Sequence, residues 1–142
     1  MRDLKVSSLG LDVKDNTVTD CGNNGILIWR SKQEEDGSVV SGNRISKIRN
    51  AAGGTGEYGN GINVFRAGSV LVSGNRISDC AYTAVRGNAA SNIQIIGNSC
   101  ERLGEVAKSM PPGIKVKTVL DRSKLVNATI WTVEKNLLEG AL

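Results

Sequence analysis

Two short phrases in this sequence place an aromatic ring directly before an arginine. Residues 25–30 read Gly-Ile-Leu-Ile-Trp-Arg, and residues 61–66 read Gly-Ile-Asn-Val-Phe-Arg. An aromatic ring suits the apolar face of a sugar, and a guanidinium group suits a carboxylate through two parallel hydrogen bonds. If adjacent repeats of one fold carry the two phrases, their side chains form a strip that fits an acidic polysaccharide. The residues of this candidate binding strip are Trp29, Arg30, Phe65 and Arg66.

A purely structural interpretation of the two phrases remains open. In it the rings close a corner of the fold, and the arginine stems lie across them with their charged ends in water. By the spacing of the repeat, Asn88 and Ala89 take the aromatic and arginine places in the next unit, which favours this interpretation. We expect no cofactor, and the absence of histidine from the chain makes a metal site improbable.

A repeated unit positions these phrases. The hexapeptide Ser-Gly-Asn-Arg-Ile-Ser occurs at residues 41–46 and again at 73–78. It belongs to a longer pattern in which four phrases end in asparagine, at Asn16, Asn43, Asn75 and Asn98. Three residues before each asparagine stands a β-branched residue, namely Val13, Val40, Val72 and Ile95. The units differ in length because extra residues rich in glycine and charge fall at 31–37 and 50–60, which we expect to be loops.

The pattern predicts an all-β fold. Each unit has two or three runs of three to five residues in which apolar residues stand two apart, and this period is that of strands with one buried face. No helix of ten residues fits between the runs, so a fold that alternates strands and helices is excluded. We therefore expect a right-handed, single-stranded parallel β-helix of about four coils, in which equivalent strands of successive coils pair.

The repeated asparagines are expected to form a structural ladder. Asparagine tolerates left-handed backbone conformations at a turn. Equivalent residues of adjacent coils lie about 4.8 Å apart, so the side-chain amides can hydrogen-bond along the column. We assign Asn16, Asn43, Asn75 and Asn98 to this ladder and give them no catalytic role.

The cysteines do not indicate a disulfide framework. Cys21 and Cys80 share one repeat position two coils apart, which separates their Cα atoms by roughly 9–10 Å. A disulfide requires less than about 7 Å between Cα atoms. We expect both to be small, buried apolar residues.

The repeat stops near residue 107. By the repeat spacing, Lys108 falls where earlier units place an inward Ile or Val, and Ser-Met-Pro-Pro-Gly comes next. The sequence thus divides into a repeat region, 1–107, and an atypical C-terminal segment, 108–142. Within that segment the patterns predict a strand at 125–133 and a short helix at 133–142. Two interpretations remain open: a cap that covers the end of the solenoid, or an end produced by a frameshift or a fragmentary gene.

The phrases NGILIW, VVSGNRIS, YGNGINVF, VLVSGNRISDC and IQIIGNSCERLGEVA resemble the twin-arginine-translocated repeat proteins of bacteria. More broadly they resemble right-handed β-helix repeats of the pectate-lyase-like kind. The resemblance covers about residues 10–107. It implies further coils on both sides and a full-length protein that is periplasmic or secreted, although this chain shows no leader. It implies no particular reaction, because those repeat proteins have none assigned.

Composition narrows the classes of function. The net charge is +4 with the basic residues scattered singly, so we expect no nucleic-acid partner. No stretch approaches the roughly 20 apolar residues that span a bilayer, so we expect no membrane partner. The oligomeric state stays open.

Catalysis by this chain alone is not expected, although the question of an enzyme stays open. Glycoside hydrolysis needs paired carboxylates, and calcium-dependent lyase chemistry needs several acidic ligands around one cation. Few of the acids are close in sequence, as Asp12 with Asp15 and Glu34 with Glu35 are, and the latter pair is in an expected loop. The leading hypothesis is a non-catalytic β-helix module of an exported bacterial protein that binds acidic polysaccharide. The alternatives are a fragment of a polysaccharide lyase or glycoside hydrolase whose active site needs absent coils, and a phage-tail or adhesin shaft.

Overall fold

A computed structural model describes residues 4–6 and 8–104 of the chain. The described part consists of short strands joined by turns and loops. The strands are β1 (Leu4–Val6), β2 (Asp12–Lys14), β3 (Thr17–Thr19), β4 (Asn24–Glu35), β5 (Val39–Ser41), β6 (Arg44–Ile48), β7 (Asn60–Gly68), β8 (Leu71–Ser73), β9 (Arg76–Cys80), β10 (Val85–Asn88), β11 (Gln94–Ile96) and β12 (Ser99–Leu103).

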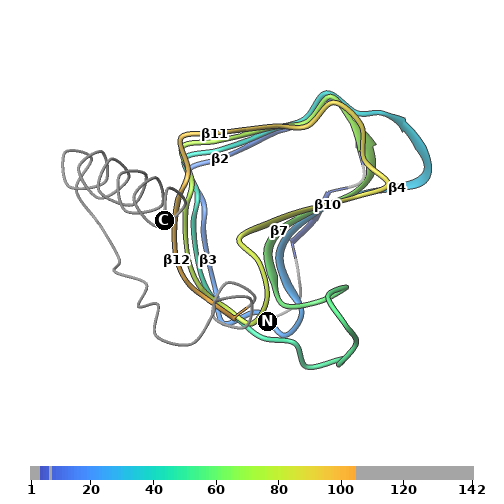
Figure 1. Ribbon diagram of the computed structural model, residues 1–142. Helices are drawn as coiled ribbons and strands as arrows, with labels where there is room; N and C mark the ends of the chain where they lie inside the picture. The colour runs from blue at the N-terminus through green and yellow to red at the C-terminus, as the bar shows by residue number, and fades with distance from the viewer. Residues whose placement is uncertain (1–3, 7, 105–142) are drawn as a thin grey trace, which may run out of the picture. The chain divides into compact units, whose positions relative to one another are not determined.

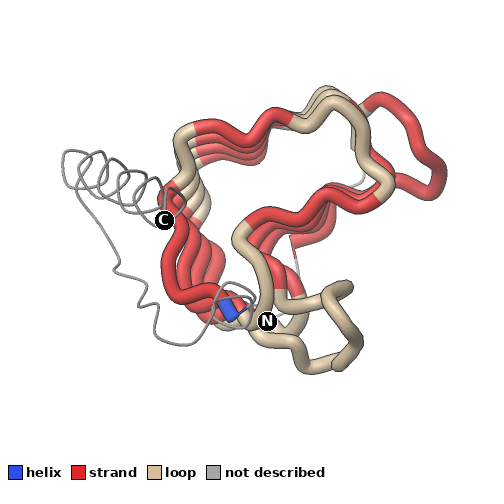
Figure 2. The backbone as a smooth tube through the Cα atoms, in the orientation of Figure 1, coloured by secondary structure: helices blue, strands red, loops and turns tan. Residues whose placement is uncertain are grey.

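The strands form three parallel sheets that run along one stack of coils. We call them sheet A (order β1-β4-β7-β10), sheet B (β2-β5-β8-β11) and sheet C (β3-β6-β9-β12). Each sheet receives one strand from each of four coils, and Figure 1 views the stack end-on, so that equivalent strands overlie one another. The chain passes through sheets B, C and A in turn (Figure 2). The parallel β-helix of about four coils predicted from the repeat is confirmed.

Apolar side chains fill the inside of the coils in rows. The valines before the ladder asparagines pair in register, with Val13 opposite Val40 and Val40 opposite Val72. Val40 and Val72 are fully buried. Ile95 continues the row opposite Val72, but 54% of it is exposed because it belongs to the last described coil. The predicted row therefore exists, and its final member lies at the end of the described stack.

The corner between sheets B and C contains the asparagine ladder. The side-chain amide of Asn43 donates to Oδ1 of Asn75 at 2.9 Å and to the carbonyl of Val13 at 2.9 Å. Equivalent amide-to-amide bonds run from Asn16 to Asn43 at 3.1 Å and from Asn75 to Asn98 at 2.9 Å. Asn43 and Asn75 are buried, and these bonds to protein atoms replace the hydrogen bonds to water that their amides lose on folding.

The prediction that the ladder asparagines themselves adopt a left-handed backbone at this corner is wrong. The left-handed residue is the one before each asparagine, and the asparagines themselves have negative φ. The left-handed positions are Asp15 (φ 57°), Gly42 (66°), Gly74 (62°) and Gly97 (63°). Glycine adopts this conformation without steric cost, which explains the repeated Gly-Asn pair. The asparagines serve as hydrogen-bonding groups.

The two predicted insert loops differ in structure. The insert at 50–60 is a loop up to Gly59, where β7 then begins. The insert at 31–37 was expected to be a loop, but β4 extends through it to Glu35. The pairing of β4 with β7 shifts between Trp29 and Glu34, so several residues of β4 face a single residue of β7. Both segments project from the stacked coils, cyan and green in Figure 1.

The two buried cysteines lie inside the coils. Cys21 is fully buried and Cys80 is 3% exposed. Burial raises the pKa of the Cys80 thiol to about 12, with smaller contributions from Cys100 and Asp79. A thiol with this pKa is neutral at physiological pH and behaves as a small apolar side chain.

Some predictions fall beyond the part of the chain that the structure describes. They are the boundary at residue 107, the strand at 125–133 and the helix at 133–142. Within residues 4–6 and 8–104, no helix has the length and apolar character that crossing a membrane requires.

Candidate functional site

The outer face of sheet A contains the rings that the sequence singled out. Along β4 and β7, alternate side chains enter the core, and Ile26, Ile28, Ile62 and Val64 are fully buried. Because successive residues of a strand point to opposite faces, the residues between them point outward. Trp29 and Phe65 are therefore on the outer face, where each is half-buried.

The two rings stand in one column. Trp29 pairs with Phe65 in the parallel register of β4 and β7, and Phe65 pairs with Asn88 of β10. Side chains at paired positions of parallel strands lie about 4.8 Å apart, so the two rings are neighbours. The predicted aromatic column is present over two coils, and Asn88 replaces the ring in the third.

Arg66 lies beside this column on the surface. Its guanidinium carbon is 4.7 Å from the centroid of the Phe65 ring, within cation–π range. One of its terminal nitrogens donates to the carbonyl of Ser31 at 2.6 Å. Arg66 has a left-handed backbone (φ 58°), as does Ala89 at the equivalent position of the next coil (φ 52°). Arg66 is also the single residue of β7 that faces the extra residues of β4. Four of its five N–H donors point to no described residue, so Arg66 can contact a ligand.

Arg30 does not join Arg66 in an exposed column, and this prediction is wrong. Arg30 is 7% exposed, and its Nε donates to Oδ2 of Asp36 at 2.6 Å. The carboxylate of Asp36 is fully buried and also accepts the backbone N–H of Ser38 at 3.0 Å. The extra residues of β4, 31–35, form an excursion that leaves the coil and returns at Asp36. The ion pair between Arg30 and Asp36 joins the two ends of this excursion. Arg30 thus has a buried carboxylate partner, whereas Arg66 forms no ion pair with the described residues and hydrogen-bonds to the carbonyl of Ser31.

A second ladder, which the sequence analysis missed, supports the start of sheet A. Asn60 donates from its amide to Oδ1 of Asn24 at 3.1 Å, and Thr83 donates from its hydroxyl to Oδ1 of Asn60 at 2.8 Å. Asn24 and Asn60 are buried. A sequence signal existed, because Asn24 and Asn60 each stand directly before the glycine of the repeated phrase.

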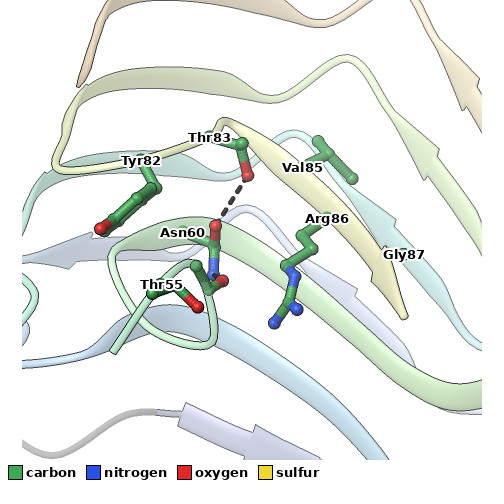
Figure 3. Close-up of a pocket in the computed structure, with 8 residues that line it drawn as sticks. Thr55, Asn60, Tyr82, Thr83, Val85, Arg86 and Gly87 are labelled. Carbon is green, nitrogen blue, oxygen red and sulfur yellow. Dashed lines mark hydrogen bonds between the residues drawn. The ribbon is translucent and has the colours of Figure 1, made fainter. Parts of the chain in front are cut away.

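A cavity of about 360 Å³ lies between the loop at 50–59 and β10. Figure 3 shows Thr55 from the loop and Tyr82, Thr83 and Arg86 from the third coil around it. Thr83 and Asn60 both line the cavity, and the hydrogen bond between them is part of its wall. Nothing in the sequence pattern predicted this cavity, because it depends on the path of a loop that has no periodicity.

Arg86 is the charged residue in the cavity lining, and Glu57 lies in the adjoining loop. The pKa of Glu57 is lowered, first by a hydrogen bond from its own backbone N–H and then by that of Thr55, with a smaller contribution from the charge of Arg86. The Glu57 carboxylate accepts the Thr55 N–H at 2.8 Å. Glu57 is therefore ionised at neutral pH and tied to its own loop.

The other candidate residues lie apart from this face. Arg44 and Arg76 pair in register on sheet C and are exposed, as expected from their place after the ladder asparagines. Among the described residues, no group of three or more His, Cys, Asp or Glu side chains is placed to hold a metal ion.

The chain is similar over part of its length to bacterial proteins named for metal resistance. It is 40% identical over 78 residues to the nickel and cobalt resistance protein CnrA of Cupriavidus metallidurans, a match that covers 54% of this chain and 7% of CnrA. It is 44% identical over 61 residues to the nickel-cobalt-cadmium resistance protein NccA of Alcaligenes xylosoxydans, covering 43% of this chain and 5% of NccA. Protein HelA of Legionella pneumophila is 51% identical over 41 residues, 29% of this chain and 4% of HelA.

These relatives are far longer than the aligned part, since the chain spans 7% or less of the length of each. No solved structure matches the chain. The sequence model of the family described as "right handed beta helix region" matches residues 5–136, which is most of the chain. Its coils are the stacked parallel strands described above. By this match, the chain belongs to the right-handed β-helix family.

Proposed function

We propose that this chain is a non-catalytic β-helix module that binds an acidic polysaccharide across the outer face of sheet A. The observation that carries the proposal is the column in which Trp29 and Phe65 stand in register, with the guanidinium of Arg66 over the Phe65 ring. Two aromatic rings one strand spacing apart offer apolar surface to a sugar, and a guanidinium beside them offers a partner for a carboxylate.

The two inserts support a binding face at sheet A. The loop at 50–59 precedes β7, and the extended end of β4 comes after Trp29, so the two insertions border opposite ends of the sheet. Loops that border a rigid sheet are common places for binding residues. Each insertion also adjoins a second sheet, because the loop at 50–59 follows β6 of sheet C and the excursion of β4 precedes β5 of sheet B.

The correction at Arg30 narrows the proposed strip to Trp29, Phe65 and Arg66. The guanidinium of Arg30 already has a buried carboxylate partner and presents no charge to a ligand. The strip therefore recognises a polymer through one charged contact and two stacking contacts per module. This favours weak binding that becomes useful when several sugar units, or several modules, act together.

The relatives named for metal resistance raise a second function, metal binding, for which the described residues give less support. No group of three potential metal-binding side chains gathers in that part of the chain. The aligned segments are also a small fraction of each relative. Lyase chemistry that depends on a bound cation has equally little support, because the same search of the described residues found no group of acids placed to hold one.

The test is retention on a column of immobilised polygalacturonate at low salt. We expect the unmutated chain to be retarded and the double variant Trp29→Ala, Arg66→Ala to elute with the unbound fraction. The matched control is Tyr58→Ala, Arg76→Ala, which removes one aromatic ring and one arginine from other exposed positions. We expect this control to be retained, and both variants to keep a β-type circular dichroism spectrum.

Two outcomes would contradict the proposal. The first is that the unmutated chain passes through acidic polysaccharide columns without delay. The second is that both double variants lose retention equally, which would reduce the interaction to net charge.

A further inference from the structure

The cavity beside β10 has the features of a second binding site, separate from the aromatic strip. Its volume of about 360 Å³ lies near the lower end of the ~300–1,000 Å³ usual for small-molecule sites. Two different coils and one loop contribute its walls (Figure 3), and it is partly open to solvent. None of the strip residues Trp29, Phe65 and Arg66 is part of its lining.

Arg86 is the charged group of this cavity. It is half-buried, and its side chain leads from β10 toward the loop at 50–59 (Figure 3). Within the described part of the chain, its guanidinium makes neither a hydrogen bond nor an ion pair. Since no described residue uses its five N–H donors, the guanidinium is available to an anionic ligand.

Polar groups without charge line the rest of the cavity. The hydroxyl of Thr83 donates to Asn60, so its oxygen can still accept a hydrogen bond from a ligand. The hydroxyl of Thr55 has no hydrogen-bond partner among the described residues. Val85 and the Tyr82 ring add apolar surface. The Tyr82 hydroxyl donates to the carbonyl of Gly54 at 3.3 Å, which attaches the loop to the third coil.

The floor of the cavity is preorganised by the second ladder. All polar atoms of the Asn60 side chain are used, since its amide donates to Asn24 and to the carbonyl of Gly56 and its oxygen accepts from Thr83. A buried group with every partner in place holds its geometry. A ligand therefore meets the hydroxyl of Thr83 in a fixed position.

The charge balance selects the kind of anion. The charge of Arg86 makes a small contribution to the lowered pKa of Glu57, so the two charges lie near one another. One positive and one negative charge leave little net potential, which disfavours a dianion such as phosphate. A single carboxylate can still form two parallel hydrogen bonds with the guanidinium. The remaining lining is suited to hydroxyl groups on the same ligand.

From these features we infer that the cavity between the 50–59 loop and β10 binds a small monocarboxylate that carries hydroxyl groups, with Arg86 on the carboxylate and Thr55 and Thr83 on the hydroxyls. This goes beyond the proposed polysaccharide function and uses different residues. Either proposal can therefore fail while the other stands.

The experiment compares four probes by isothermal titration of the full chain. D-Gluconate has a carboxylate and hydroxyls, sorbitol keeps the hydroxyls without the carboxylate, and hexanoate keeps the carboxylate without the hydroxyls. Inorganic phosphate is the fourth probe. We expect gluconate to bind at least tenfold more tightly than any of the other three.

Variants locate the binding. Arg86→Gln is expected to reduce gluconate affinity at least tenfold and to remove the preference over sorbitol. The matched control Arg76→Gln, an exposed arginine on sheet C, should leave affinity unchanged. Equal melting temperatures for the two variants would show that Arg86→Gln has not unfolded the site.

Three results would overturn the inference. They are equal affinity for gluconate and sorbitol, tighter binding of phosphate than of gluconate, and unchanged gluconate binding in Arg86→Gln. Retention on polygalacturonate that persists in Arg86→Gln but is lost in Trp29→Ala, Arg66→Ala reports on the aromatic strip separately from the cavity. If the chain is retained on polygalacturonate but does not bind gluconate, the cavity proposal is wrong and the proposal for the aromatic strip stands.

Discussion

Arg30 and Arg66 end the same six-residue phrase in adjacent coils, yet they lie in opposite environments. Arg30 is buried against the carboxylate of Asp36, whereas Arg66 is exposed and lies over the ring of Phe65. The preceding residues do not cause the difference, because Trp29 and Phe65 pair in register. The difference arises after the arginine, since only β4 continues into an excursion that returns Asp36 to its base.

A repeat therefore fixes the positions of strands more firmly than it fixes the environment of the residues at the ends of those strands. Inside the strands, identical offsets give identical burial, as at Ile26 and Ile62. At the end of the phrase, a few inserted residues supply a new partner and change a candidate binding residue into part of the structure. Substitutions in and around the two phrases test this distinction.

The largest expected effect is at Arg30. Arg30→Ala leaves the buried carboxylate of Asp36 without its cation, and breaking a buried ion pair from one side typically costs about 3–5 kcal/mol. Urea unfolding followed by circular dichroism measures the loss. Arg66→Ala should cost far less, and equal losses for the two variants would contradict the assignment of Arg30 to the interior.

The second prediction concerns what the phrases share. A Cβ added at Gly61 would lie 2.5 Å from Cγ2 of Ile77 and 2.7 Å from the carbonyl oxygen of Ala84. A Cβ at Gly25 would meet the corresponding atoms one coil earlier, the carbonyl oxygen of Gly61 and Cγ2 of Ile45. Overpacking of this kind costs about 1–3 kcal/mol.

We therefore expect Gly25→Ala and Gly61→Ala to destabilise the chain by similar amounts in urea unfolding. Replacement of Gly37, which has open space around its α-carbon, is the steric control. It retains a penalty for its left-handed backbone (φ 73°), so its effect measures backbone strain without crowding. If only one of the two phrase glycines were sensitive, the phrases would not occupy equivalent places.

The third prediction separates stability from binding at Arg66. Removal of an exposed cation–π contact should change the free energy of unfolding by no more than about 1 kcal/mol. The same Arg66→Ala variant should be retained less on polygalacturonate. A variant that loses stability without losing retention would place Arg66 among structural residues, beside Arg30.

The smallest effect is expected at an exposed ion pair on sheet C. A hydrogen bond from Arg102 holds the pKa of Asp79 below its ordinary value, and Arg102 contacts it through Nε and Nη2 at 2.5 and 2.9 Å. Because the folded pKa is depressed, the pair stabilises the fold above the ordinary pKa of aspartate, about 3.9, and this contribution disappears as the pH falls through the lower folded value.

Asp79→Asn should therefore lower the urea midpoint slightly at pH 6 and leave it unchanged well below the folded pKa. Asparagine is a suitable replacement because it tolerates the left-handed backbone of this residue (φ 53°). If Asp79→Asn lost as much stability at pH 6 as Arg30→Ala, the exposed and the buried ion pair would contribute equally, which would contradict the account.

The rows of the core were predictable from sequence because their cause is local. Two-residue periodicity and a constant offset from each Gly-Asn pair place Val40 and Val72 on one face in register. The same offsets put Trp29 and Phe65 in one column. Parallel pairing turns equal offsets into spatial neighbours, so counting was enough.

The candidate sites depend on inserted segments that have no repeat period, so their positions could not be predicted from offsets in the sequence. The partner of Arg30 comes from the insert, and no periodicity indicates that Asp36 returns to the interior. The cavity beside β10 depends on a loop in which four glycines have positive φ, so its path is not set by a strand pattern. The second ladder was missed because Thr83 replaces asparagine in the third coil, although Asn24 and Asn60 share a place in the phrase.

The central claim is that the outer face of sheet A, at the column of Trp29 and Phe65, receives a carbohydrate. Nuclear magnetic resonance of the ¹⁵N-labelled chain titrated with trigalacturonate tests it most directly. The account predicts shifts at the indole N–H of Trp29 and at the backbone amides of residues 63–66, with the amides around Arg44 and Arg76 unmoved. Shifts confined to sheet C, or no shifts at saturating sugar, would contradict it.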